Sequence, residues 1–129
     1  MPLIKINTYK GRSTDEIELL LDTVHEAVLL AFRVPQRDRY QLLFEHDPSH
    51  FRALDTGLGF ERTAKFVMLE VISRPRDRSE KLTFYREVVA QLHAKCSIPP
   101  ADVMISFVDN TDEDWSFGEG SAQFLTGQL

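Results

Sequence analysis

Cysteine is almost missing from this sequence, since Cys96 is the only one among 129 residues. A single cysteine excludes an intrachain disulfide and any metal site built from several cysteines. Long hydrophobic runs are missing as well, because no stretch approaches the roughly 20 apolar residues that span a bilayer. The segment Met1–Lys5 has no charged part leading into an apolar run, so we expect no secretory signal. These absences predict a cytoplasmic protein without a membrane partner.

Basic residues are outnumbered, with 15 Lys and Arg against 20 Asp and Glu and a net charge of −5. A general nucleic-acid binder takes most of its affinity from a basic face, so we expect no nucleic-acid partner. Of the four histidines, His46 and His50 lie four residues apart, but Pro48 between them disfavours a helical metal site. The glycines of Asp55–Gly59 lack the lysine of a phosphate loop. The sequence therefore predicts no metal site and no organic cofactor.

The first part of the chain has the order strand, helix, strand. Polar and apolar residues alternate over Leu3–Tyr9, which indicates a strand. A capping box of Ser13 and Glu16 opens a helical pattern, in which we place His25 on the exposed surface. A second strand is expected at 40–45.

A second part repeats this order about 60 residues later. The run Phe66–Ile72 is almost continuously apolar and indicates a strand covered on both faces. Ser79 is expected to cap the next helix. One face of that helix is predicted to carry Leu82, Tyr85, Val89, Leu92 and Cys96. Another buried strand is expected at Val103–Val108.

Two such units predict an α+β fold with duplicated β-α-β units, spanning 2–45 and 66–108 of a single domain that covers 1–129. The strands within each unit are expected to be parallel, joined by right-handed crossovers. Packed together, the units form one four-stranded sheet with two helices on one face. The remaining residues, 109–129, form a C-terminal arm.

The face of the sheet away from the helices is too apolar to meet water. We expect a homo-oligomer whose sheets pack against each other, or else a covering by the irregular segment 46–64. The arm 109–129 contains Trp115, Phe117, Phe124 and Leu129. A disordered tail rarely holds so many large apolar groups, so we expect an ordered arm packed over a neighbour or a pocket.

The N-terminus is the first candidate for chemistry. A small second residue, here Pro2, normally allows Met1 to be removed, which leaves a secondary amine at the start of the chain. Such an amine titrates nearer neutrality than a lysine does, and neighbouring charges decide whether it acts as a base or an acid. Many proteins begin Met-Pro for no chemical reason, and with Met1 retained the Pro2 nitrogen is an amide and cannot react.

Two arginines follow the buried strand just before the second helix. Arg74 and Arg76 flank a proline, and guanidinium groups are suited to holding a carboxylate through paired hydrogen bonds. Ligands of α/β folds also tend to bind at the carboxyl ends of strands. The alternative is a solvated turn in which these arginines pair with Asp77 or Glu80.

A carboxylate between two arginines is the third candidate. Asp38 lies between Arg37 and Arg39, in a loop before a strand. It is either a catalytic carboxylate or part of a surface salt bridge.

Taken together, the N-terminal proline and the repeated strand–helix–strand unit resemble the tautomerase superfamily, and the motifs look like those of its malonate semialdehyde decarboxylase family. These motifs are Val34–Pro35, Asp38–Tyr40, Asp55–Gly59, Ser73–Arg76, Asp114–Gly118 and Phe124–Gly127. The resemblance covers essentially the whole chain, and the motifs are specific in combination. Glu119 departs from it, since the family leads us to expect a basic residue there.

The resemblance implies a homotrimer with inward-facing sheets and a cofactor-independent decarboxylase acting on a small-molecule carboxylate substrate, malonate semialdehyde. The catalytic residues that it implies are Pro2, Asp38, Arg74 and Arg76. An apolar wall against the substrate would be formed by Trp115, Phe117, Phe124 and Leu129. The alternatives are a keto–enol (phenylpyruvate-type) tautomerase or a hydratase on the same scaffold, or a binding protein without catalysis if Met1 is retained.

Overall fold

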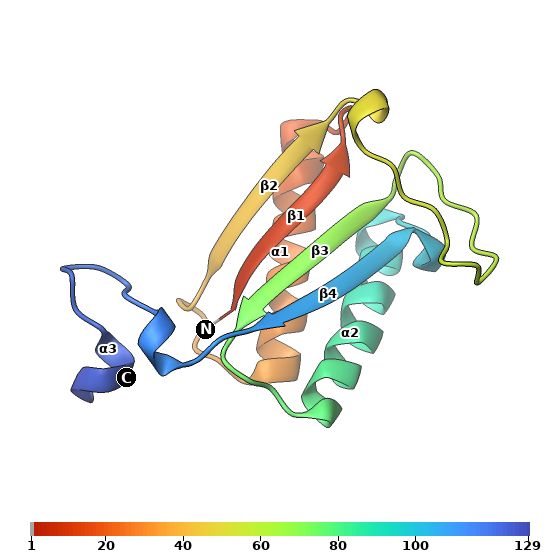
Figure 1. Ribbon diagram of the computed structural model, residues 1–129. Coiled ribbons are helices and arrows are strands. Elements are labelled where there is room, and N and C mark those ends of the chain that lie inside the picture. The colour runs from red at the N-terminus through yellow and green to blue at the C-terminus, as the bar shows by residue number, and fades with distance from the viewer. Residues whose placement is uncertain (1) are drawn as a thin grey trace.

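A four-stranded sheet with two long helices on one face forms the body of the protein (Figure 1). The computed structural model describes residues 2–129, so Met1 and its removal lie outside the described residues. The elements in chain order are β1 (Leu3–Tyr9), α1 (Thr14–Phe32), β2 (Tyr40–His46), β3 (Val67–Ser73), α2 (Arg78–Cys96), β4 (Val103–Asp109) and α3 (Gln123–Thr126). The strand order is β2-β1-β3-β4, parallel within each strand–helix–strand unit and antiparallel between β1 and β3. This arrangement confirms the predicted α+β fold.

Helix α1 begins where the capping box predicts. The Ser13 hydroxyl accepts the backbone N–H of Glu16 at 3.2 Å, and the Glu16 carboxylate accepts the backbone N–H of Ser13 at 3.1 Å. The helix ends at Phe32 and is followed by the C-cap Arg33, which adopts a left-handed conformation with φ of 53°. None of the helices among residues 2–129 combines the length and apolar character needed to cross a bilayer.

Helix α2 differs from the prediction at its start and on its buried face. Its N-cap is Asp77, whose carboxylate accepts the backbone N–H of Glu80 at 2.8 Å and the hydroxyl of Ser79 at 2.8 Å. The prediction of Ser79 as the cap is therefore wrong by two residues. The buried stripe is Phe84, Val88 and Leu92, whereas Leu82 is 47% exposed. The helix has apolar residues on two adjacent stripes, and only packing against the sheet decides which one is buried.

The Asp77 cap predicts how stability responds to acid. The backbone N–H of Glu80 and the Ser79 hydroxyl hold the pKa of Asp77 below its ordinary value. Because the pKa is lower in the folded state, the cap stabilises the protein above the unfolded pKa of about 4, and this contribution is lost as the pH falls through the folded value. Asparagine accepts the same hydrogen bonds without titrating.

We therefore expect Asp77→Asn to lose less stability than the wild type on acidification below about pH 4. The measurement is chemical unfolding between pH 7 and pH 2.5. Glu18→Gln, which removes an exposed carboxylate of α1, controls for the loss of one negative charge. Parallel pH profiles for the Asp77→Asn variant and the wild type would contradict the assignment.

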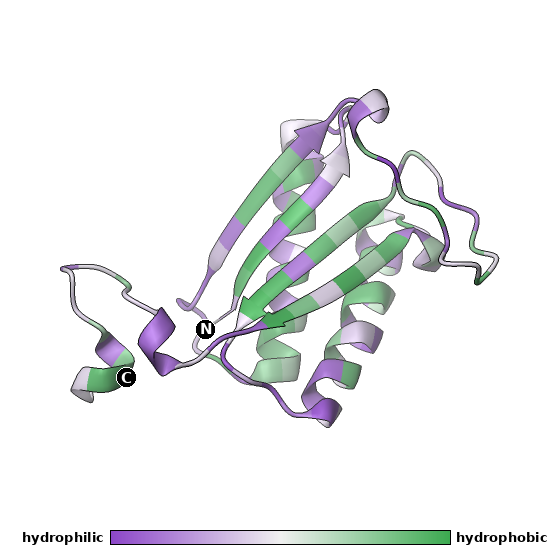
Figure 2. Cartoon of the chain, in the orientation of Figure 1, coloured by the Kyte–Doolittle hydropathy of each residue, from purple (hydrophilic) through white to green (hydrophobic). Residues whose placement is uncertain are grey.

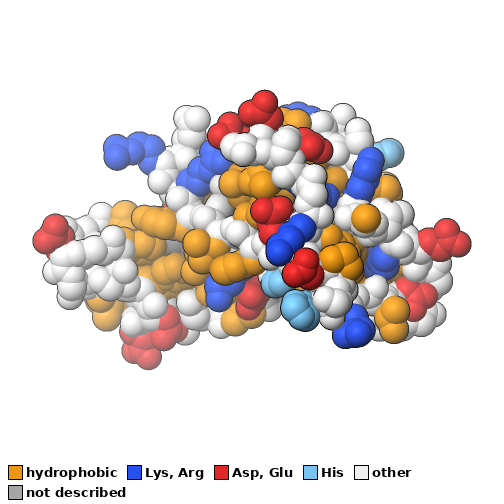
Figure 3. Space-filling model, turned by 90° about the horizontal axis from the view of Figure 1, so that it is seen from above, with side chains coloured by type: hydrophobic (Ala, Val, Ile, Leu, Met, Phe, Trp, Pro, Cys, Tyr) orange, Lys and Arg blue, Asp and Glu red, His pale blue; other side chains and the backbone are white. Residues whose placement is uncertain are grey.

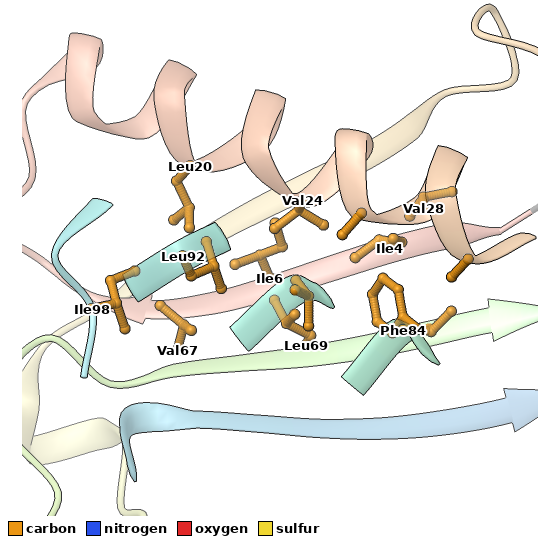
Figure 4. Packing of buried hydrophobic residues seen from close by; sticks show 14 of the residues in the cluster. Ile4, Ile6, Leu20, Val24, Val28, Val67, Leu69, Phe84, Leu92 and Ile98 are labelled. Atoms are coloured by element: carbon orange, nitrogen blue, oxygen red, sulfur yellow. The ribbon is translucent and has the colours of Figure 1, made fainter. Parts of the chain in front are cut away.

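The hydrophobic core fills the space between the two helices and the sheet (Figure 4). β1 contributes Ile4 and Ile6, and β3 contributes Val67 and Leu69, all at most 2% exposed. The helices contribute the fully buried Leu20, Val24, Val28, Phe84, Val88 and Leu92. Alternate residues of the central strands therefore point toward the helices. The strand at 66–72 was predicted to be covered on both faces, but within the chain only its helix-facing side is buried.

The opposite face of the sheet is largely uncovered, although all four strands carry hydrophobic bands (Figure 2). Its exposed apolar side chains, between 41% and 47% accessible, are Tyr40, Leu42, Phe44, Met104 and Val108. The segment 46–64 reaches only one end of this face, where the Phe51 ring packs 4.9 Å from that of Tyr9 and 5.1 Å from that of His46. The covering of this face by the chain itself is thus confined to one end.

Candidate active site

The sheet topology brings four parts of the chain to one end of the molecule. Leu3 pairs with Ile72 of the antiparallel β3 and with Tyr40 of the parallel β2. Consequently Pro2, the turn after β3 and the loop before β2 all lie at this end. The C-terminal arm folds beside the N-terminus at the same end (Figure 1). Residues separated by more than 100 positions in the sequence thus meet around Pro2.

Pro2 and Asp38 line one small recess at the start of β1. Pro2 is buried, and Asp38 is 8% exposed. A turn in which the backbone N–H of Asp38 donates to the carbonyl of Pro35 at 2.9 Å directs this residue inward. The neighbouring Arg39 instead pairs with Asp22 at 2.7 Å. The surface interpretation of Asp38 is therefore wrong, and the structure places this carboxylate next to the N-terminal proline.

His25 lines the same recess, which the sequence analysis missed. We predicted it on the helix surface, but it is only 6% exposed. Its Nε2 lies 2.9 Å from the carbonyl oxygen of Gln36, so it ties α1 to the loop that carries Asp38. The helical spacing of the sequence indicates this burial, because His25 lies one turn from both Leu21 and Val28, two residues of the apolar stripe.

A cavity of about 230 Å³ adjoins the recess. Its lining consists of Pro35, Arg37, Asp38, Tyr40, Phe117 and Leu129. Asp38 and Tyr40 line both the cavity and the recess. The structure therefore brings Asp38, a predicted catalytic residue, together with Phe117 and Leu129 of the predicted apolar wall. It adds Tyr40, which belongs to the Asp38–Tyr40 motif but was not predicted as a site residue.

The aromatic residues of the C-terminal arm stack on one another beside this cavity. The Phe117 ring lies 5.3 Å from that of Trp115, 5.5 Å from that of Phe124 and 5.7 Å from that of Tyr40. The Trp115 indole N–H donates to the side chain of Asn110 at 2.7 Å. The arm projects to one side, and hydrophobic side chains gather where it meets the body (Figure 3). Phe117 and Leu129 of the arm line the cavity beside Asp38, as the pocket alternative predicts, whereas Leu125 and Leu129 are 62% and 61% exposed and stay available to a neighbouring chain.

Arg74 is held against this aromatic cluster. Its guanidinium carbon lies 4.1 Å from the centre of the Phe124 ring, and its Nε donates to the Asp112 carboxylate at 2.6 Å. Its partner is therefore a residue of the arm, neither Asp77 nor Glu80. A guanidinium has further N–H donors at its two Nη atoms, and these leave Arg74 able to hold a second carboxylate.

Arg76 lies deeper, against the end of α1. Its Nε donates to the Ser73 hydroxyl at 3.2 Å, and its Nη1 lies 3.7 Å from the Glu80 carboxylate, the pairing that the turn interpretation predicted. Its guanidinium carbon is 4.9 Å from the centre of the Phe32 ring. The side chain is 15% exposed. Neither arginine lines the cavity beside Asp38.

The charged groups at this end can polarise and orient an organic anion. An N-terminal amine beside a buried carboxylate can carry a proton, and two guanidinium groups can hold a carboxylate. Across residues 2–129, no group of three or more His, Cys, Asp or Glu side chains is arranged to hold a metal ion.

Comparison with known proteins identifies similar sequences over the whole chain. Two family models, both described as tautomerase enzyme, match residues 2–61 and 38–118. In Bacillus subtilis (strain 168), the probable tautomerase YrdN is 46% identical over 129 residues, which is 100% of each chain. The probable tautomerase YusQ from the same strain is 30% identical over 126 residues, covering 97% of this chain and 99% of its own.

Solved structures also match this chain over nearly its whole length. A malonate semialdehyde decarboxylase superimposes with a TM-score of 0.97 at 46% identity, over 98% of each chain. FG41 malonate semialdehyde decarboxylase, inhibited by 3-bromopropiolate, gives a TM-score of 0.94 at 38% identity, over 98% of this chain and 97% of its own. A fused 4-OT, described as a wild-type symmetric trimer, shares the fold at 17% identity with a TM-score of 0.79, over 97% of this chain and 98% of its own.

Proposed function

Because this chain belongs to the tautomerase family, we propose that it is a cofactor-independent decarboxylase that converts 3-oxopropanoate (malonate semialdehyde) into acetaldehyde and CO2. The observation that carries the proposal is the full-length similarity to a malonate semialdehyde decarboxylase. The recess shared by Pro2 and Asp38 supports it. The reaction is that of a carbon–carbon lyase, and acetaldehyde formation from 3-oxopropanoate tests it.

The Pro2 amine supplies the electrostatic driving force. With Met1 removed, this amine is a secondary amine, and the neighbouring Asp38 carboxylate favours its protonated form. The ammonium N–H donates to the aldehyde oxygen of the substrate and stabilises the negative charge that develops there. The electrons of the breaking C–C bond move into the enolate, CO2 leaves, and a proton added to carbon gives acetaldehyde.

The two arginines and the aromatic arm act on the substrate carboxylate. Arg74 and Arg76 hold it so that the breaking bond lies perpendicular to the carbonyl plane, where the electrons can enter the π system. The apolar wall of Trp115, Phe117, Phe124 and Leu129 removes water from the carboxylate and favours departure of neutral CO2. The covalent alternative is a cationic Schiff base: the neutral Pro2 amine attacks the aldehyde, water leaves, and the resulting iminium accepts the electrons of the breaking C–C bond before hydrolysis releases acetaldehyde.

A keto–enol tautomerase or a hydratase on the same scaffold is the second candidate, because the two curated relatives are named probable tautomerases. A tautomerase needs Pro2 as a neutral base, whereas the electrostatic route of decarboxylation needs it protonated. We expect a titration of the ¹⁵N-labelled Pro2 amine by NMR to show a mostly protonated amine at pH 7. A neutral amine at pH 7 would contradict the electrostatic route of decarboxylation and favour the tautomerase.

Retention of Met1 gives a third candidate, a binding protein without catalysis. The Pro2 nitrogen would then be a tertiary amide that can neither donate a proton nor attack a carbonyl. Intact mass spectrometry of the purified protein distinguishes the two forms directly.

Three copies of the chain assemble through the uncovered faces of their sheets. This homotrimer is supported by the exposed apolar side chains of β2 and β4 and by the trimeric state of a fused 4-OT with the same fold. Burying these side chains between subunits removes apolar area from water, which is the dominant favourable contribution in association.

We expect Leu42→Glu to convert the trimer into monomers, because it places a charge among the exposed apolar side chains that β2 contributes to this face. The measurement is light scattering after size exclusion, in which the wild type gives three times the chain mass of 14.8 kDa. Leu30→Glu is the matched control, since Leu30 is 59% exposed on α1, outside the sheet. A trimer that persists in the Leu42→Glu variant would contradict this interface.

A further inference from the structure

A second cavity, of about 490 Å³, lies at the end of the sheet opposite to Pro2. It is formed where β1 ends, α1 begins and α2 ends, and Figure 3 looks onto this end of the molecule. β1 separates the two sites, since Pro2 precedes this strand and the cavity begins at Tyr9. The proposed decarboxylation makes no use of this cavity.

Cations dominate its lining, although the whole chain has a net charge of −5. Four of the lining residues are basic, namely Lys10, Arg12, Lys65 and Lys95, against the single carboxylate of Glu16. Lys10 pairs with Asp47 at 3.4 Å, and Lys95 pairs with Glu26.

Arg12 and Lys65 are the two cations of this cavity without a carboxylate at ion-pair distance within the described part of the chain. Arg12 Nη2 donates to the Lys65 carbonyl at 2.9 Å, and Lys65 Nζ donates to the Ser97 carbonyl at 3.1 Å. Both bonds use neutral acceptors, so neither charge is compensated by them. Partial burial of a charge strengthens its interaction with an opposite charge.

Arg12 is the more buried of the two. Burial lowers the pKa of its guanidinium, and the nearby Glu16 acts in the opposite direction. Glu16 is held in place by the capping box, since its carboxylate accepts the Ser13 backbone N–H. A guanidinium stays charged even when partly buried. The cavity thus contains a fixed, half-buried positive charge with N–H donors left for an anion.

Most of the remaining lining residues are apolar. Leu19 and Leu20 of α1 line the cavity together with Tyr9, Ala64 and Cys96. A surface of this kind beside a cation is suited to a ligand with an apolar body and a charged end.

We propose that this cavity binds a small organic anion, whose carboxylate or phosphate group is held by Arg12 and Lys65 and whose apolar part lies against the exposed Leu19 and Ala64. Its volume is more than twice that of the cavity beside Asp38. The site is independent of the proposed decarboxylation, because it shares no residue with the Pro2 end.

The test uses phenyl phosphate, benzoate and inorganic phosphate as probes, with binding followed by ¹H–¹⁵N NMR of the intact protein. We expect phenyl phosphate or benzoate to give saturable shifts at the amides of Gly11, Ala64 and Ser97. The comparison of these two probes shows whether phosphate or carboxylate is preferred. Inorganic phosphate, which lacks an apolar part, is expected to bind more weakly than phenyl phosphate.

Arg12→Gln is expected to weaken binding about tenfold or more, because hydrogen bonds to a charged group are lost. Lys65→Gln is the second variant, and it tests the site if Arg12→Gln fails to fold. Arg86→Gln removes an exposed cation of α2 outside the cavity and is expected to leave binding unchanged. Absence of saturable shifts at these three amides, shifts confined to the Pro2 end, or equal affinity in the wild type and the folded cavity variants would overturn the proposal.

Discussion

Replacing Arg76 with alanine is expected to lower kcat/KM for decarboxylation of 3-oxopropanoate about 100-fold or more. Removing a charged hydrogen-bonding partner from a mostly buried carboxylate costs about 3 kcal/mol of transition-state stabilisation. Each 1.4 kcal/mol lowers the rate by a factor of about ten. The loss of stability is expected to be smaller, about 1–2 kcal/mol, since Arg76 also contacts Phe32 and Glu80.

Two further variants make this result specific. Arg76→Lys keeps the charge but loses the paired N–H geometry, so it is expected to remain well below the wild type in activity. Arg78→Ala, two residues further on at an exposed position of α2, is expected to retain full activity. If the melting temperature and the activity of the Arg76→Ala variant fell in proportion, Arg76 would be a structural residue.

Blocking the Pro2 nitrogen is expected to abolish nearly all turnover. An alanine inserted between Met1 and Pro2 converts the Pro2 amine into an amide after removal of Met1, while the proline ring stays in the chain. Proton donation by a positioned group contributes about 10²–10⁴-fold to a rate, and we expect a loss of this size. The measurement is acetaldehyde formation by protein of confirmed mass.

The inserted alanine lies next to a buried residue, so a loss of activity could also come from a loss of stability. Pro2 is buried at the start of β1, so unfolding of the inserted variant must be compared with that of the wild type. An alanine inserted after Phe60, in the exposed loop before β3 and away from the Pro2 end, serves as a length-matched control. Full activity in the protein with a blocked N-terminus would exclude both the electrostatic and the Schiff-base route.

Much of the fold is predictable from the sequence because its determinants are local. The capping box of Ser13 and Glu16 and the apolar run after Phe66 each specify their own element. The wrong predictions concern features that depend on contacts with residues distant in the sequence. Both Asp77 and Ser79 are good N-caps, and only the path of the chain selects Asp77.

The candidate site was less predictable, for the same reason. The burial of Asp38 depends on packing around the start of β1, and its cavity is lined in part by Phe117 and Leu129 of the C-terminal arm. No local pattern gives such contacts across the chain. The resemblance to a family supplied these residues together, whereas His25 lay outside its motifs and was missed.

Acetaldehyde formation from 3-oxopropanoate by the protein that begins at Pro2 tests the central claim most directly. The starting residue is established by intact mass, and the Arg74→Ala and Arg76→Ala variants are assayed in parallel. We predict rapid turnover by the wild type that is nearly lost in both variants. No acetaldehyde from protein with a free Pro2 amine would contradict the decarboxylase assignment and leave tautomerisation or hydration as the reaction of this site.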